Sequence, residues 1–271
     1  MNTTLSFSNV LTWLNDPANW RGADGVLAHL REHVLYTLIA VGIAALIALP
    51  LGLLIGHTGR GVVLGAGSAN ALRAIPTFGL LILLVVWISP KIHAHQAVTG
   101  LIKQGGLAYL VPTEIVLIVL AIPAILTNTY AGVQNVDPAV RDAARGMGMT
   151  GGQVVRKVEF PCALPLIISG IRSATLQVIA TATVAAYLPF LGGLGRFVVD
   201  GLTTLNDPHD GYPKMVSGAI LVAALAVVAD LLLIGVQRVV VSPGISGRYS
   251  RRKLTPEQVT VQDIDVQVAR A

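Results

Sequence analysis

The sequence has few charges, few aromatic rings and one cysteine. Charged residues make up 12% of its 271 residues, aromatic residues make up 5%, and the cysteine is Cys162. A single cysteine excludes an internal disulfide framework. The charged fraction is about half of that in an average soluble domain, which excludes a surface that faces water all round. Because there is no long acidic or basic tract, we expect no nucleic-acid partner.

The sequence also lacks the motifs of nucleotide and metal sites. No G-x-x-x-x-G-K-[ST] loop occurs in it, so we expect no ATP site and no cofactor on this chain. Residues 146–151 read GMGMTG, but a dinucleotide fingerprint needs a βαβ unit, which is implausible between two membrane spans. His93 and His95 have no Cys, Asp or Glu beside them. We therefore expect no metal, no catalytic residues and no enzyme.

Long apolar stretches dominate what is present. Hydrophobic residues make up 54% of the chain, and the mean hydropathy is +0.70. A helix needs about 20 apolar residues to cross a bilayer. The sequence predicts an all-α polytopic membrane protein with five spans, near 34–56, 74–90, 113–135, 168–190 and 215–237. A sixth crossing at 62–76 is the alternative, but Ser68, Asn70 and Arg73 favour an interfacial position for that segment.

The lysines and arginines predict the orientation. With the N-terminus outside and five spans, 13 of the 19 lie on the inner side and 6 on the outer side, as the positive-inside rule requires. The predicted organisation is an extracytoplasmic or interfacial segment (1–33), a transmembrane domain (34–240) and a cytoplasmic tail (241–271). Trp13 and Trp20 in the first segment suit either an amphipathic helix at the interface or a partly ordered tail.

The loop at 137–165 is predicted to lie in the cytoplasm as two short helices. Asp137 and Pro138 form a helix start, and glycines from Gly146 onward are expected to stop that helix. The second piece, QVVRKVEF, is expected to end at Pro161 and Pro165. Small side chains on this hairpin would let another backbone approach closely, which suits a docking surface for a soluble partner.

This loop resembles the EAA signature of ABC importer permeases. The signature reads Glu-Ala-Ala, three residues, Gly, nine residues, Ile-x-Leu-Pro. The chain has Asp142-Ala143-Ala144, three residues, Gly148, nine residues and Val158-Glu159-Phe160-Pro161. In that family the loop is a coupling helix that sits in a groove of the ATPase subunit. The resemblance assigns ATPase coupling to Asp142, Ala143, Ala144, Gly146, Gly148 and Pro161.

The resemblance extends over about residues 30–240. LRAIPTFGLLIL, NTYAGVQNVDPAVRDAARGMGMT, TATVAAYLPFLGGLG and VVADLLLIGVQR resemble osmoprotectant-uptake permeases, which carry glycine betaine, choline, carnitine or proline. The resemblance implies the type I importer (MetI-like) fold and a bacterial inner-membrane location among lipids. It also implies three partners: an ABC ATPase that carries ATP and Mg²⁺, a second permease, identical or homologous, and an extracytoplasmic substrate-binding protein. The alternatives are a methionine or other amino-acid importer and, more distantly, an ion-coupled secondary transporter, which usually carries an internal repeat.

Polar residues inside the spans are the candidates for a substrate path. On a helix through the fourth span, Ser173, Gln177, Thr181, Thr183 and Tyr187 share one face. They line a path at a dimer interface or pack against neighbouring helices. Asn128 and Tyr130 face the same two alternatives. Asp230 attracts a cationic substrate or, as we favour, pairs with a group such as Arg172.

Two features of the outer side complete the expectations. GGLGR at 192–196 is a plain turn, a gate or a docking edge for a binding protein. The aromatic residues are few and do not cluster in the sequence, whereas tight binding of a quaternary ammonium group usually needs an aromatic cage. We therefore expect high-affinity capture on a separate protein and only a weak, wet path through this one.

Overall fold

The computed structural model describes residues 6–61, 67, 71, 74–92, 106–205, 207 and 210–242, and these form helices without any strand. Most of the stretch at 62–76, both histidines of the predicted outer loop (His93 and His95) and the tail from 243 onward lie outside the described residues.

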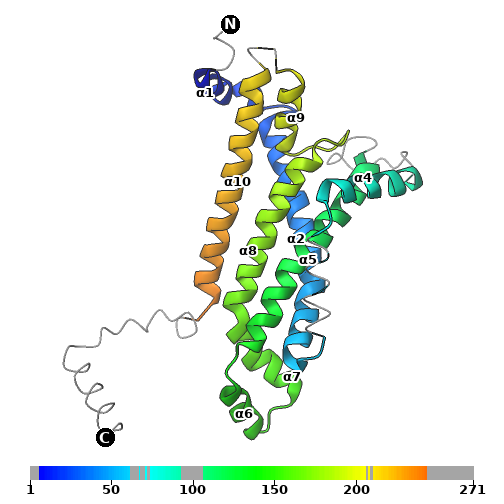
Figure 1. The fold of residues 1–271 in the computed structure, drawn as a ribbon. Helices are drawn as coiled ribbons and strands as arrows, with labels where there is room; N and C mark the ends of the chain where they lie inside the picture. Colours follow the sequence, from blue (N-terminus) through cyan, green and yellow to red (C-terminus); the bar gives the residue numbers. More distant parts are fainter. Residues whose placement is uncertain are drawn as a thin grey trace, which may run out of the picture.

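Four described helices are long and apolar enough to cross a membrane. They are α2 (Val26–Thr58), α5 (Gly106–Gln134), α8 (Phe160–Ala185) and α10 (Gly211–Val240). Figure 1 shows them along one axis, with the N-terminus at one end of the bundle. The first of them begins at Val26 rather than near residue 34, because the polar turn around His29 and Glu32 is also helical.

The second predicted span is a short helix. α4 (Thr77–Ile88) has 12 residues and is followed by the 3₁₀ turn η2 (Ser89–Lys91). At 1.5 Å per residue α4 is roughly 18 Å long, less than the roughly 30 Å of hydrocarbon. Pro76 lies directly before it and Pro90 just after it, which limits its length because proline disfavours helix in the residue before it. α4 lies to one side of the bundle (Figure 1). The described residues therefore hold four long apolar helices and one shorter one.

The N-terminal segment is helical and packed. α1 (Phe7–Asn15) is capped by Ser6, and the 3₁₀ turn η1 (Pro17–Trp20) follows it. Trp13 is buried, with its ring centroid 5.5 Å from that of Phe197 in an edge-to-face contact. The Trp20 indole N–H donates to the Leu14 carbonyl at 2.7 Å. Of the two alternatives for this segment, the structure therefore has the helix.

Small residues bring α2 and α5 together. A Cβ added to Gly52 would lie 2.6 Å from the Cβ of Thr129, and one added to Gly56 would lie 2.6 Å from the Cβ of Val133. Glycine at both positions is therefore needed for this approach, and small residues are the usual means of helix packing in membranes. The core between α2, α5 and α8 is apolar, with Ala40, Ala44 and Ala48 of α2 fully buried.

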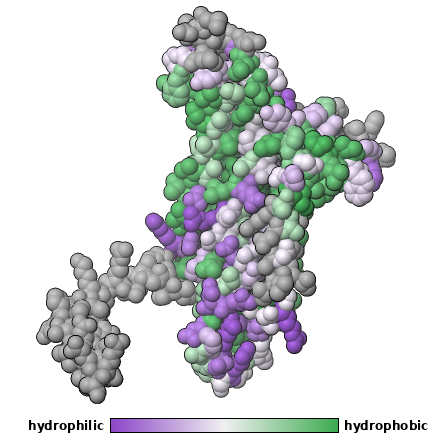
Figure 2. All heavy atoms as spheres, in the orientation of Figure 1, coloured by the Kyte–Doolittle hydropathy of each residue, from purple (hydrophilic) through white to green (hydrophobic). Residues whose placement is uncertain are grey.

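The loop at 137–165 forms two short helices at the end of the bundle opposite the N-terminus (Figure 1). α6 (Pro138–Gly146) is followed by α7 (Gly151–Val154) and by the π-helical turn η3 (Val155–Glu159), which continues into α8. Hydrophilic side chains gather over this end in Figure 2. The elements therefore separate a polar end from an apolar bundle.

The expectation that Pro161 and Pro165 end the second helix was wrong. The helical path runs without interruption from Gly151 to Ala185, and both prolines lie inside it. The Phe160 N–H bonds to the Val155 carbonyl, five residues back. A π turn of this kind widens the helix just before Pro161, and proline is tolerated where local π adjustments and neighbouring helices satisfy the backbone.

Candidate functional site

The hairpin of α6 and α7 presents a small, exposed surface. The Asp137 carboxylate accepts from the Ala139 N–H at 2.8 Å, and Thr150 and Gln153 form a capping box at the start of α7. Gly148 joins the two helices with φ +82°, a conformation that side chains rarely adopt. Sequence signals of helix start and stop therefore set this geometry.

Most of the predicted coupling residues face outward, but not all. Asp142, Ala143, Gly146 and Gly148 are exposed, Ala144 is buried, and Pro161 is half-buried inside α8. Three apolar side chains of the same hairpin, Val140, Ala143 and Met147, are exposed at spacing i, i+3 and i+7. That spacing places them on one face of α6. Sequence reasoning missed Val140 and Met147, although this spacing was visible in the sequence.

A buried carboxylate fixes the hairpin to the bundle. Glu159 is fully buried, and its Oε2 lies 2.8 Å from Nδ1 of His57 at the end of α2. Its Oε1 lies 3.0 Å from Nε of Arg141 in α6, an ion pair in which the N–H is not aligned as a hydrogen bond. A second nitrogen of Arg141 donates to the Val133 carbonyl in α5. One cluster thus joins α2, α5, α6 and the π turn.

Sequence reasoning missed this cluster. His57 and Glu159 are 102 residues apart, and nothing in a single sequence pairs them. The only available signal was a glutamate between apolar residues in VEFPCALP, which needs a partner if it is buried.

The polar face of α8 points away from the chain's own core. Ser173 is exposed, and Gln177, Thr181 and Thr183 are half-buried. Tyr187 is exposed too, but it lies in the turn after α8 ends at Ala185 and so is not on the helix face that the sequence predicted. The opposite face, including Val178, Ile179, Ala182 and Ala185, is buried. In a membrane, hydrocarbon cannot satisfy an exposed polar face, so this stripe needs protein or water against it.

Asn128 and Tyr130 are not part of that face. The Asn128 amide donates to the Ala124 carbonyl of its own helix at 2.8 Å, and its side chain lies against Gly170. Tyr130 is buried in the apolar core. Within one chain both residues pack between helices, apart from the stripe on α8.

Asp230 has the partner that we favoured for it. Arg172 Nε donates to one carboxylate oxygen at 2.8 Å and Nη2 donates to the other at 3.0 Å. This two-point pair links α8 to α10, and such charge-assisted pairs are among the strong hydrogen bonds of proteins. The pair satisfies both charges without a substrate.

The GGLG segment is held by side chains of α2. The Gly193 N–H lies 3.0 Å from Oε2 of Glu32, and the Leu194 N–H donates to Nδ1 of His33 at 3.2 Å. His33 Nε2 lies 3.1 Å from the Ile179 carbonyl, so the ring bridges two segments. A Cβ on Gly192 would lie 1.6 Å from the Glu32 carboxylate. The segment is therefore a clamped turn, and sequence reasoning missed the clamp because it placed Glu32 and His33 before the first span.

A second intramembrane acid also escaped notice. Glu114 in α5 is buried, and neither carboxylate oxygen has a hydrogen-bond partner among the described residues. A buried carboxyl without partners is costly, and in a membrane it is a functional candidate by default. In the described part of the chain, no group of three His, Cys, Asp or Glu stands close enough to hold a metal.

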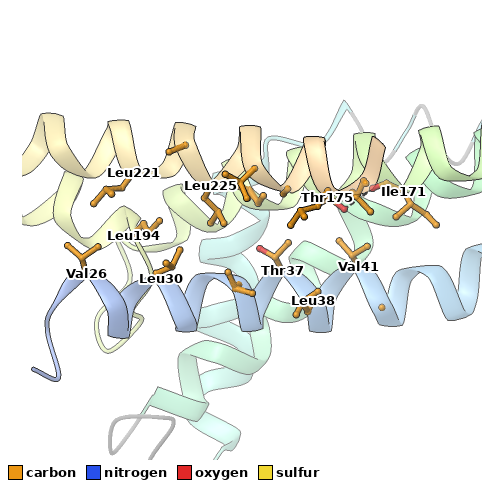
Figure 3. A pocket seen from close by; sticks show the side chains of 18 of the residues that line it. Val26, Leu30, Thr37, Leu38, Val41, Ile171, Thr175, Leu194, Leu221 and Leu225 are labelled. Atoms are coloured by element: carbon orange, nitrogen blue, oxygen red, sulfur yellow. Dashed lines mark hydrogen bonds between the residues drawn. The ribbon is translucent and has the colours of Figure 1, made fainter. Parts of the chain in front are cut away.

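The large cleft between α2, α8 and α10 is not suited to a polar substrate. It has a volume of about 710 Å³ and is lined by apolar side chains such as Leu30, Val41 and Leu225 (Figure 3). Its hydroxyls, Thr37 and Thr175, both donate to carbonyls of their own helices at 2.8 Å. Both hydroxyl protons are therefore already used, and the apolar lining suits hydrocarbon.

Comparison with known proteins gives consistent relatives. The profile of the family described as "Binding-protein-dependent transport system inner membrane component" matches residues 36–240. The osmoprotectant import permease protein OsmW of Salmonella typhimurium is 34% identical, with 82% of this chain and 94% of that protein covered. The glycine betaine/carnitine/choline transport system permease protein OpuCB of Bacillus subtilis is 30% identical, with 80% and 88% covered.

Solved structures share the fold. The MetNI methionine ABC transporter in an inward-facing conformation superimposes with a TM-score of 0.62 at 22% identity, covering 80% of this chain and 96% of that one. An amino acid ABC transporter with histidines gives a TM-score of 0.59 at 18% identity, covering 87% and 99%. At these identities the likeness shows the MetI-like fold and nothing about substrate.

Proposed function

This chain belongs to the family of inner membrane components of binding-protein-dependent transport systems, and from that membership we propose that it imports an osmoprotectant such as glycine betaine, choline, carnitine or proline. It is the permease subunit of an ABC importer. The observation that carries the substrate class is the set of relatives at 30% identity or more, whose names include osmoprotectant import and glycine betaine, carnitine and choline transport.

The proposed orientation places the α6–α7 hairpin in the cytoplasm and the N-terminus outside. Arg141, Arg145, Arg156 and Lys157 all lie in or beside the hairpin, and this polar end lies opposite the N-terminal end of the bundle (Figure 2). The excess of basic residues on the inner side supports this orientation.

The hairpin is proposed to transmit movement from an ATPase subunit to the helices. The exposed apolar face of α6, with Val140, Ala143 and Met147, suits a groove on that partner. The partner binds ATP and Mg²⁺ and hydrolyses the ATP. Because Glu159 ties α6 to α2 through Arg141 and His57, a shift of the hairpin moves the inner ends of the spans with it.

Two permease subunits are proposed to enclose the path. The polar stripe of α8 lies on the outside of a single chain, and a second copy or a homologous permease would cover it. An extracytoplasmic binding protein would supply high affinity, and alternating access driven by ATP would supply direction.

Transport by the reconstituted complex tests the proposal. This chain is co-reconstituted with its ATPase, any second permease and its binding protein, and uptake of labelled glycine betaine, choline, carnitine, proline and methionine is followed with and without ATP. We expect ATP-dependent uptake of a betaine-type compound. Gly148→Val should abolish uptake, because valine strongly disfavours the φ of +82° at this turn.

Gly152→Ala is the matched control, because Gly152 is exposed, helical and free of neighbours within 4 Å of an added Cβ. It should transport normally. Uptake of methionine alone would move the chain to an amino-acid importer. Normal uptake and normal ATPase assembly by Gly148→Val would contradict the coupling role of the hairpin.

A further inference from the structure

Four aromatic rings that are scattered in the sequence gather beside the outer part of α8. The ring centroids of Phe78 in α4 and Tyr187 are 6.2 Å apart at an interplanar angle of 77°. Those of Tyr109 in α5 and Phe190 are 5.7 Å apart at 33°. The aromatic residues do not cluster in the sequence, but α4 and α5 bring rings from distant segments to the end of α8.

Two of these rings open onto a pocket of about 530 Å³. Tyr187 and Phe190 line it and are 51% and 54% exposed, so about half of each residue is left uncovered despite the contacts with Phe78 and Tyr109. Phe197 and His29 line it too, and Phe197 makes edge-to-face contacts with His29 and with Trp13. This volume lies in the range of small-molecule sites.

The backbone conformation at Phe190 is strained. Phe190 has φ +65° and is the one non-glycine residue with a positive φ among those described. For a bulky side chain this conformation is uncommon and costly, and such strain is concentrated at binding and active sites. The strain presents a half-exposed ring to the pocket.

The pocket also carries charges of both signs. Asp24 and Asp200 are its acids, and Arg196 and Lys214 are its bases. Arg196 Nε is paired with Asp200 at 2.8 Å, whereas the Lys214 ammonium has no ion pair among the residues that the structure describes. Lys214 is thus the cation available to a carboxylate ligand.

We propose that this pocket is the permease's own outer binding site for a zwitterionic quaternary ammonium compound. The trimethylammonium group lies against the faces of Tyr187 and Phe190, since ring faces attract such cations, and the carboxylate points to Lys214. The inference rests on the proposed function and adds a location and residues to it. Tyr187 also lies in the turn that follows α8, whose polar stripe contains Gln177 and Thr181, so the pocket lies at the outer end of the proposed path.

Saturation-transfer difference NMR on the permease–ATPase complex in nanodiscs, without the binding protein, tests the site directly. Glycine betaine is the probe, and its N-methyl signal is read. We expect saturation transfer in the wild type and binding roughly five- to tenfold weaker in Tyr187→Leu/Phe190→Leu. Tyr187→Phe keeps the ring and should bind like wild type. The isostere 3,3-dimethylbutanoate keeps the carboxylate but has a neutral carbon in place of the quaternary nitrogen, and it should bind as weakly as betaine does to the double variant.

Lys214→Gln tests the other end of the ligand. It should weaken betaine binding by a similar factor and leave choline, which has no carboxylate, unchanged. Each variant is first shown to purify with the ATPase subunit in the same ratio as the wild type. We expect this assembly, because the two half-exposed rings are not core residues. Three results would overturn the site if the wild-type importer still takes up betaine. They are no saturation transfer in the wild type, unchanged binding in the double variant, and equal binding of the isostere. Absence of all betaine-type uptake would instead refute the proposed function and the site with it.

Discussion

At the scale of single residues, the arginine and aspartate inside the bundle satisfy each other. Arg172 and Asp230 form a two-point pair between α8 and α10, and each side chain is about a quarter exposed, at 28% and 27%. A pair of this kind stabilises the attachment of α10, because removing one partner leaves a charge without compensation in a low-dielectric setting.

A double-mutant cycle on this pair distinguishes a structural role from a substrate role. Arg172→Gln and Asp230→Asn should each lower the free energy of unfolding by about 1–3 kcal/mol. The double variant should lose less than the sum of the two, and thermal unfolding of the purified complex measures all three. Loss of choline uptake in Asp230→Asn, with unchanged unfolding and a normal Arg172→Gln, would point to substrate attraction instead.

The residue scale also shows the limit of a single sequence. A charged residue inside an apolar run needs a partner. For Asp230 the sequence suggested Arg172, and the structure confirms this pair. For Glu159 the same logic can state only that a buried glutamate needs a partner, and not which residue supplies it. His57 and Arg141 reach it only because the end of α2, the hairpin and the π turn meet in space.

At the scale of elements, the contact between α2 and α5 depends on glycine. At Gly56 an added Cβ would lie 2.6 Å from the Cβ of Val133 and 3.0 Å from the Tyr130 carbonyl oxygen. The second of these is backbone, which cannot rotate away. The two helices are therefore so close that a methyl group added at Gly56 would push one helix away from the other.

Substitution by alanine tests this contact. Gly56→Ala should destabilise the complex by about 1–3 kcal/mol, because overpacking outweighs the gain in helix propensity. Gly42→Ala in the same helix is the control, because nothing lies within 4 Å of its added Cβ, and it should be neutral or stabilising. Thermal unfolding of both variants measures the difference. Equal unfolding temperatures would show that α2 adjusts without cost.

At the scale of the whole molecule, one chain is an incomplete transporter. The polar stripe of α8 is exposed or half-buried, and the Glu114 carboxyl has no partner among the described residues. The large apolar cleft between α2, α8 and α10 has no free hydroxyl proton to offer a substrate. A second permease subunit against the stripe would complete the path.

Cross-linking in the membrane tests that arrangement. In a Cys162→Ser background, Ser173→Cys should form a disulfide-linked pair of permease subunits on mild oxidation, seen as a doubled mass on a non-reducing gel. If the partner is a homologous permease, a cysteine at its equivalent position is needed as well. Leu231→Cys on the exposed side of α10 is the control and should remain monomeric. Cross-linking at Leu231 and not at Ser173 would place the subunit contact on α10.

The sequence by itself determined the membrane class, the long apolar helices and the hairpin that precedes α8, because apolar run length and the capping chemistry of Asp137, Pro138 and Gly148 are local properties. Only the tertiary structure decided which distant side chains meet. The shortness of α4, the Glu159 cluster, the clamp on the GGLG turn and the gathering of Tyr187 and Phe190 with Phe78 and Tyr109 depend on how the helices cross. The crossing of α2 and α5 depends on small residues such as Gly52 and Gly56. No local sequence pattern shows that these two residues lie close to α5.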